Sequence, residues 1–282
     1  MKTVRINGKQ LPSIGLGTWH MGDQIGQRPQ ELAALQAGIS AGASVIDTAE
    51  MYGNGRSEKL VGESISNMQR DSLYLISKVL PENASAKRLP QRLDRSLMAL
   101  GTDYLDLYLL HWRGTIPLSE TVQALEDAKQ AGKIRGWGVS NFDVADLQEL
   151  LSVPHGENVS ANEVLFNLQN RGPLFDLLPW QQQHQLPLIA YSPIAQGDQL
   201  GGQLRQNKIL QTIALAHQTS VFTIMLAWVV DHQQVLAIPQ TSQRQHALVN
   251  VAAGKIQLTD QERRQLAAAF PTPTRKEPLA VL

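Results

Sequence analysis

The sequence contains no cysteine, and aromatic residues make up only 5% of it. The lack of cysteine excludes disulfide bonds, thiol catalysis and cysteine-ligated metal, and it is compatible with a reducing cytoplasm. An excess of one charge is lacking too, because 25 lysines and arginines balance 25 aspartates and glutamates. Such a chain offers no basic surface for nucleic acid or anionic lipid, so we expect neither as a partner.

Long apolar runs are also missing. The longest apolar-rich segment, Val221 to Val230, is far too short to span a bilayer. The charged start, Met1 to Arg5, is followed by no apolar stretch, which argues against a secretory signal. No linker, low-complexity block or internal repeat divides the chain, so we expect a single cytoplasmic domain over residues 1–282.

What the sequence does have is a regular alternation of short apolar runs and longer helical patterns. Asn7-Gly8 between residues 3–6 and 9–12 predicts an N-terminal β-hairpin. The candidate strands end near Gly17, Asp47, Lys78, His111, Ser140, Glu163, Tyr191 and Pro239. Helical spacing covers residues 31–41, 57–65, 87–100, 119–131, 144–151, 177–184, 209–217, 221–231 and 244–253.

Strands that alternate with helices imply parallel pairing through right-handed crossovers. Eight such units favour a closed (β/α)₈ TIM barrel over an open doubly wound sheet. An open sheet would usually carry a complete glycine-rich fingerprint after its first strand, and the segment from Gly15 to Gly17 lacks the third glycine. Residues 271–282 contain three prolines and no periodicity, which predicts an irregular C-terminal tail.

Polar side chains occupy the ends of several candidate strands, and in a barrel these ends share the face that carries the site. Asp47 would be costly to bury alone, but Lys78 on a neighbouring strand can pair with it. We expect the ammonium to lower the pKa of nearby Tyr52, so that Tyr52 can act as a general acid toward a carbonyl oxygen. His111 supplies a second donor that can orient that carbonyl.

Each of these residues has a plainer interpretation when taken singly: a surface lysine, a core histidine, a capping aspartate or a loop tyrosine. Their occurrence together at successive strand ends favours catalysis. Lys78 could alternatively be the nucleophile of a Schiff-base lyase or aldolase, but this needs a neutral amine, and Asp47 would keep it charged. The seven histidines show no ligand spacing, so we expect no metal site.

With these residues in place, the sequence resembles the aldo-keto reductase family. The motifs that carry the resemblance fall in the family's order and spacing from residue 15 to about residue 250, and they are LGTWHMG, VIDTAEMYGNG, SKV, TDYLDLYLLHW, GKIRGWGVSNF, AYSPIAQG and AIPQT. The resemblance implies a (β/α)₈ barrel, a nicotinamide cofactor bound without a Rossmann motif, and a catalytic tetrad. Carried over, the tetrad is Asp47, Tyr52, Lys78 and His111.

The resemblance also implies the positions that bind cofactor and substrate. Ser140 and Asn141 match the residues that bind the nicotinamide carboxamide, and Tyr191 matches the aromatic ring on which the nicotinamide stacks. The further cofactor positions are Gly17, Thr18, Trp19, Asp47, Glu163, Ser192, Ile194, Gln196, Gln240, Thr241, Arg244, His246 and Asn250. Substrate would contact Trp19, Tyr52, His111 and Trp112, of which the two tryptophans would line the pocket.

Three positions depart from the family pattern. Glu163 stands where the family usually has glutamine, and an ionised glutamate can only accept hydrogen bonds. We hypothesise that its negative charge tightens binding of the oxidised cofactor relative to the reduced one. Gln240 and His246 stand where NADPH-preferring members commonly carry a lysine and an arginine, which leaves Arg244 as the obvious cation for a 2′-phosphate. NADPH is favoured on family grounds, with NADH or dual use as alternatives.

The motif style resembles bacterial members that reduce methylglyoxal and similar aldehydes, which predicts a small carbonyl substrate. The competing hypothesis is a cofactor-sensing regulatory protein with little turnover, since some relatives serve as channel subunits. The resemblance further implies a monomer. The sequence itself does not determine whether the tail over residues 271–282 covers the pocket.

Overall fold

The computed structural model describes residues 1–195 and 202–282. A two-stranded antiparallel hairpin, β1 (Thr3–Ile6) and β2 (Lys9–Pro12), precedes an eight-stranded parallel sheet. The sheet contains β3 (Leu16–Gly17), β4 (Val45–Asp47), β5 (Tyr74–Val79), β6 (Leu107–Leu110), β7 (Trp137–Ser140), β8 (Asn162–Leu165), β9 (Leu188–Tyr191) and β10 (Val235–Ala237). The hairpin and the parallel strands confirm the predicted alternation.

The strands of the large sheet pair in the order of the sequence, from β3 to β10, and every pair is parallel. This order has no point of reversal, so the sheet is not doubly wound. The sheet curls until its outer strands meet: Gly15 N donates to Ala237 O at 2.8 Å and Gly17 N donates to Pro239 O at 3.1 Å. A Cβ on Gly17 would lie 2.6 Å from Ile238 O, so this approach requires glycine.

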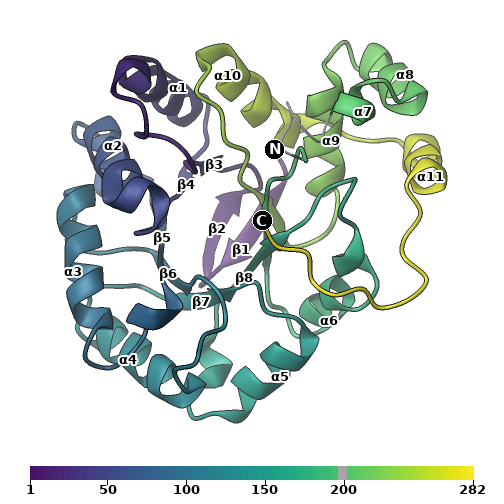
Figure 1. The fold of residues 1–282 in the computed structure, drawn as a ribbon. Coiled ribbons are helices and arrows are strands. Elements are labelled where there is room, and N and C mark those ends of the chain that lie inside the picture. Colours follow the sequence, from purple (N-terminus) through teal and green to yellow (C-terminus); the bar gives the residue numbers. More distant parts are fainter. Residues whose placement is uncertain (196–201) are drawn as a thin grey trace.

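Helices surround the curled sheet on its outer side (Figure 1). They are α1 (Arg28–Ser40), α2 (Arg56–Ile65), α3 (Leu89–Leu100), α4 (Leu118–Gln130), α5 (Val144–Ser152), α6 (Leu177–Gln183), α7 (Gly202–Arg205), α8 (Lys208–Ala216), α9 (Val221–Val229), α10 (Arg244–Ala252) and α11 (Asp260–Ala269). Nine of these match the helical segments that the sequence predicts, within a few residues. The short helix α7 and the helix α11 were not predicted, although Thr259 and Glu262 form a capping box at the start of α11.

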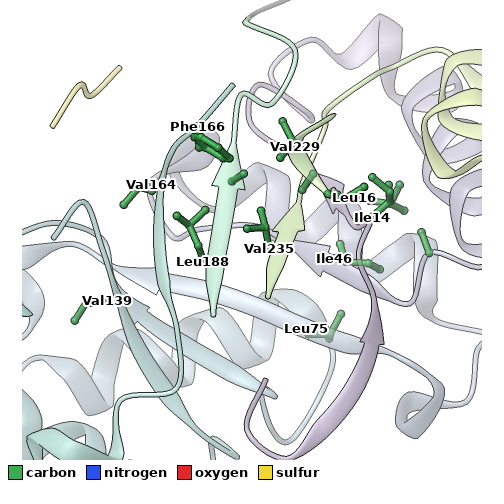
Figure 2. Close-up of a cluster of buried hydrophobic side chains, with 14 of the residues drawn as sticks. Ile14, Leu16, Ile46, Leu75, Val139, Val164, Phe166, Leu188, Val229 and Val235 are labelled. Atoms are coloured by element: carbon green, nitrogen blue, oxygen red, sulfur yellow. The ribbon is translucent and has the colours of Figure 1, made fainter. Parts of the chain in front are cut away.

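In β4, β5, β6, β9 and β10 the side chains alternate between two hydrophobic clusters, as the two-residue period of a strand requires. Outward residues such as Ile46, Leu75 and Leu188 pack between the sheet and the helices (Figure 2). Inward residues such as Val45 and Ile76 pack with the hairpin in a second cluster. The hairpin thereby fills the end of the curled sheet opposite to the carboxyl ends of its strands.

The C-terminal tail has no helix or strand beyond α11, as predicted, and it returns to the middle of the molecule (Figure 1). Lys276 pairs with Asp143 at 3.1 Å and with Asp176 at 3.5 Å, which fastens the tail to the loops before α5 and α6. The backbone of Leu282 comes within hydrogen-bonding reach of the Tyr191 hydroxyl. The tail therefore ends at the carboxyl ends of the parallel strands.

Within the described ranges, no single helix is long and apolar enough to cross a membrane. By length and composition alone, α8 and α9 would suffice as a pair, but they are bent by 92°.

Candidate active site

Three side chains of the predicted tetrad, Asp47, Lys78 and His111, continue the inward-facing rows of the barrel strands. Asp47 lies two residues after the inward Val45, and Lys78 lies two residues after the inward Ile76. His111 and Glu163 follow the inward Leu109 and Ala161 in the same way. Strand alternation therefore turns the last inward position of several strands from apolar to polar, and the polar side chains converge above the inner cluster.

Lys78 is the hub of this group. Its Nζ donates to Asp47 Oδ1 at 2.6 Å, to Thr48 O at 3.0 Å and to the Tyr52 hydroxyl at 3.2 Å. Lys78 and Asp47 are buried, so the predicted ion pair is present and answers the cost of burying Asp47. Burial alone would lower the pKa of Lys78, but the carboxyls of Asp47 and Glu163 outweigh it and raise that pKa. Lys78 is thus held charged, which disfavours a Schiff-base nucleophile.

Tyr52 reaches this lysine because the chain turns sharply after β4. The 3₁₀ turn Tyr52–Gly55 places three consecutive residues, Gly53 to Gly55, at positive φ, which glycine and asparagine tolerate best. The expectation that Lys78 lowers the Tyr52 pKa is wrong for the net shift: burial raises this pKa above its ordinary value. Lys78 opposes the rise, but the carboxyls of Asp47 and Glu163 add to it.

His111 borders the same space. Its ring centroid lies 5.9 Å from that of Tyr52, in an edge-on arrangement, and its Nδ1 is buried with no hydrogen-bond partner among the described residues. Burial, with the nearby ammonium of Lys78, lowers the pKa of His111 to about 3. The ring is therefore neutral near neutral pH, with one nitrogen able to donate a hydrogen bond.

Glu163 approaches the same ammonium from the far side of the barrel. Its Oε1 lies 3.4 Å from Lys78 Nζ, and its side chain is 2% exposed. Burial raises the pKa of Glu163 well above its ordinary value, and the adjacent carboxylate of Asp47 raises it further. Burial therefore opposes the negative charge that the sequence analysis expects on Glu163.

The three residues predicted to hold the nicotinamide lie together at the ends of β7 and β9. Asn141 Nδ2 donates to His111 O at 3.1 Å, and Asn141 Oδ1 accepts from the Tyr191 hydroxyl at 3.0 Å. Ser140 Oγ donates to Glu163 O at 3.0 Å, which ties β7 to β8. Asn141 adopts a positive φ of 60°, which turns its amide back over the strand ends. Tyr191 is half-buried.

The other predicted cofactor positions fall into two groups. Thr18 is fully buried and its hydroxyl donates to Asp47 O at 2.8 Å, so it supports the strand that carries Asp47. Ser192 and Ile194 follow β9, where Ser192 takes a positive φ. Gln196 lies outside the described residues.

The second group lies around the start of α10. Gln240, Arg244 and His246 are exposed, Thr241 is half-buried, and Asn250 is buried further along the helix. Arg244 also borders a cavity of about 370 Å³ between α1 and α10, away from Lys78. The cation predicted for a phosphate, Arg244, thus lies exposed at the outer rim, whereas the charges of Lys78, Asp47 and Glu163 are buried.

Trp19 and Trp112 are both half-buried next to this face. The Trp112 ring lies 4.8 Å from His111 between centroids, in a tilted arrangement, whereas Trp19 stacks on His20 at 4.3 Å. Trp112 therefore packs against the tetrad residue that precedes it in the sequence.

Several supporting residues were not predicted. Glu50 accepts hydrogen bonds from Leu80 N at 2.7 Å and from Asn83 Nδ2 at 2.9 Å, which fixes the loop after β5. The contact between Glu163 and Lys78 was not predicted either, although both follow inward apolar residues by two positions. Among the residues that the structure describes, no group of three or more His, Asp or Glu side chains could hold a metal ion.

Comparison with known proteins extends these observations. A family model described as "Aldo/keto reductase family" matches residues 13–270. The chain is 46% identical over 279 residues to methylglyoxal reductase YeaE of Escherichia coli, covering 99% of this chain and 98% of that one. It is also 34% identical over 269 residues to glyoxal reductase of Bacillus subtilis, covering 94% and 92% of the two chains. A crystal structure of an aldo/keto reductase from Klebsiella pneumoniae in complex with NADP and acetate is 48% identical, with a TM-score of 0.97 and coverage of 100% and 99%.

Proposed function

The chain belongs to the aldo/keto reductase family, and on that premise we propose that it reduces small aldehydes and ketones to alcohols with NADPH. The observation that carries this proposal is the triple contact of Lys78 Nζ with Asp47, Thr48 O and the Tyr52 hydroxyl. We take the curled sheet to be the closed (β/α)₈ barrel of this family, with its site at the carboxyl ends of the strands.

Tyr52 is the proton donor in this proposal. Its pKa lies above the ordinary value, so the hydroxyl is protonated near neutral pH, as a general acid must be. Lys78 holds the hydroxyl at 3.2 Å and stabilises the phenolate that forms when the proton leaves for the carbonyl oxygen. Asp47 holds Lys78 in place, and His111 hydrogen-bonds the carbonyl oxygen from the opposite edge.

The residues at the strand ends suit a nicotinamide. The carboxamide needs both donors and acceptors, and Ser140, Asn141 and the protonated Glu163 supply both. Tyr191 offers a half-buried ring beside them for stacking. The buried Nδ1 of His111, without a partner in the described chain, indicates that this region is shaped for a further polar group. When bound, the cofactor supplies the hydride for the carbonyl carbon.

Methylglyoxal is the substrate that the relatives favour, because the E. coli and B. subtilis proteins are a methylglyoxal reductase and a glyoxal reductase. Trp112 beside His111, with Trp19 on the same face, would confine a small carbonyl compound. A monomeric state and a cytoplasmic location remain part of this proposal, the first on family grounds and the second on the absence of cysteine.

The decisive experiment compares initial rates of methylglyoxal reduction by the unmodified chain and by Tyr52→Phe, with NADPH and with NADH. Because the phenylalanine keeps the ring but lacks the proton, we expect kcat to fall by about 10² to 10⁴. Tight cofactor binding with negligible turnover in the unmodified chain, on methylglyoxal and a panel of other aldehydes, would instead support the regulatory binding protein.

Arg244 is the residue that we propose for selecting NADPH. It begins α10, whose N-terminus favours anions, and its guanidinium can bind a 2′-phosphate. Because a hydrogen bond to a charged group contributes about 1.5–3 kcal/mol, Arg244→Gln should raise the KM for NADPH by at least about tenfold. The KM for NADH should stay nearly constant. The exposed Arg264 provides a matched control, since Arg264→Gln should change neither value.

An unchanged NADPH-to-NADH ratio in Arg244→Gln would remove Arg244 from the proposal. Gln240, Thr241 and His246, at the same rim, would then be the candidates for the phosphate contact.

A further inference from the structure

The cluster around Lys78 has one carboxyl more than its charge can balance. Asp47, Lys78 and Glu163 are all buried, with side-chain exposures of 2%, 0% and 2%. If both carboxyls were ionised, the buried cluster would carry a net negative charge, and an uncompensated charge in such a place is costly. One retained proton makes the cluster neutral.

The hydrogen bonds of Lys78 decide which carboxyl keeps that proton. An ammonium has three N–H groups, and those of Lys78 are directed to Asp47, Thr48 O and Tyr52. Glu163 Oε1 lies 3.4 Å from the ammonium, whereas Asp47 Oδ1 lies 2.6 Å from it, so Glu163 receives the weaker stabilisation. Asp47 is the better stabilised anion, and Glu163 is the carboxyl that stays neutral.

The unpartnered oxygens of the two acids support this assignment. Asp47 Oδ2 and Glu163 Oε2 are both buried, and if both acids are ionised neither oxygen has a hydrogen-bond partner among the described residues. A proton on Glu163 lets it donate to Asp47, and the two side chains are within reach for this bond. One shared proton would satisfy two atoms that are otherwise anomalous in a folded protein.

We propose that Asp47 and Glu163 share one proton while the site holds no ligand or the reduced cofactor, and that Glu163 releases this proton to solvent when the oxidised, cationic nicotinamide binds. The proposal rests on the proposed function, because hydride transfer requires the ring within about 3.5 Å of a carbonyl held by Tyr52. Lys78 lies 3.2 Å from the Tyr52 hydroxyl and 3.4 Å from Glu163, so the ring charge would form close to this acid.

The other groups around Glu163 do not replace it in this role. Lys78 is held charged by the carboxyls beside it. Burial raises the pKa of Asp47, but the direct hydrogen bond from Lys78 opposes that rise and favours the Asp47 anion over that of Glu163. His111 is neutral near neutral pH, and burial raises the pKa values of Tyr52 and Tyr191 above their ordinary values. Glu163 is thus the group of the cluster whose ionisation can compensate the positive charge of the oxidised nicotinamide. The cluster and the nicotinamide ring together are then neutral with either the reduced or the oxidised cofactor.

The test counts protons on binding. Titration calorimetry of the cofactors in two buffers of different ionisation enthalpy gives the number of protons released by NADP⁺ and by NADPH. The 2′-phosphate is common to both cofactors, so its own protonation cancels in the difference. We expect about one proton more to be released with NADP⁺ than with NADPH, and we expect no difference in Glu163→Gln.

Two control variants identify the source of the proton. Glu58→Gln removes another buried acid, which accepts from Ser77 at 2.7 Å on the outer side of β5, and should keep the one-proton difference. Tyr52→Phe should keep it as well, whereas its disappearance there would mean that the tyrosine is the source. Equal proton counts in the unmodified chain, or a difference that persists in Glu163→Gln, would overturn the proposal.

A second measurement needs no variant and therefore does not depend on the folding of Glu163→Gln. The affinity of the unmodified chain for NADP⁺, relative to NADPH, should increase by up to about tenfold for each pH unit until Glu163 ionises in the unliganded site. Parallel pH profiles for the two cofactors would contradict the proposal while leaving the reductase function intact. Failure of both cofactors to bind would overturn the reductase function as well.

Discussion

Two lysines of this chain are each shared by two carboxyl groups at nearly the same distances, yet they do different things. Lys78 lies 2.6 Å from Asp47 and 3.4 Å from Glu163, whereas Lys276 lies 3.1 Å from Asp143 and 3.5 Å from Asp176. The side chain of Lys78 is fully buried, and that of Lys276 is 47% exposed. The two clusters have a similar arrangement of charges but differ in their exposure to solvent.

Burial decides the protonation of the second acid. Around Lys78 it raises the pKa of Glu163, so that one acid becomes neutral and the cluster can respond to a ligand. Asp143 is only partly buried, and backbone hydrogen bonds together with Lys276 lower its pKa. Around Lys276 water screens the charges, so the ion pairs fasten the tail without storing a proton. The buried Lys78 thus changes the protonation of the acids beside it, whereas the exposed Lys276 only holds the tail in place.

The largest expected effect tests this comparison through stability. Lys78→Met keeps the side-chain length but leaves the acids of the cluster buried without their cation. Because removing one partner of a buried ion pair leaves an uncompensated group, we expect the free energy of unfolding to fall by about 3–5 kcal/mol. Lys276→Met is the matched change at the surface and should cost at most about 1 kcal/mol. Urea unfolding near neutral pH measures both.

Equal losses in the two variants would show that burial does not distinguish the two clusters. A fully active Lys78→Met would separately contradict the role proposed for Lys78 at Tyr52. The tail variant Lys276→Met should keep its catalytic rate within a small factor, since Lys276 contacts neither Tyr52 nor Lys78.

Much of the inner cluster could be predicted from the sequence because strand geometry is strict. Asp47, Lys78 and His111 end apolar runs whose two-residue period assigns them to one face, and parallel strands bring those ends together. Tyr52 lies in the turn five residues after Asp47, where the sequence predicts a general acid, and the resemblance to the aldo-keto reductases implies the same role. The structure confirms that Asp47, Tyr52 and Lys78 are in contact and that His111 lies beside Tyr52.

The protonation states could not be predicted in the same way, because they depend on distances across the barrel. Lys78 was expected to lower the pKa of Tyr52, but the sequence does not reveal that burial and a second acid outweigh one ammonium. Glu163 lies on β8 and Lys78 on β5, so no local pattern joins them. The helix α11 was missed for a different reason: six of its ten residues are Asp, Glu, Arg or Gln, and only Leu266 is buried.

A smaller effect, on the pH dependence of stability, tests the reach of the Lys78 charge. Burial and Lys78 lower the pKa of folded His111 to about 3, whereas an unfolded histidine titrates near its ordinary value of about 6.5. Between these values the unfolded chain binds more protons, so stability is lost as the pH falls. From about pH 7 to about pH 5 this group should cost about 2 kcal/mol, and His111→Gln should remove that part of the loss. Urea unfolding without cofactor at both pH values measures the slope, and His246→Gln, at an exposed position, should leave it unchanged. A slope that persists in His111→Gln would mean that His111 is not kept neutral by its surroundings. The cluster around Lys78 would then resemble the surface cluster around Lys276 more closely than its burial indicates.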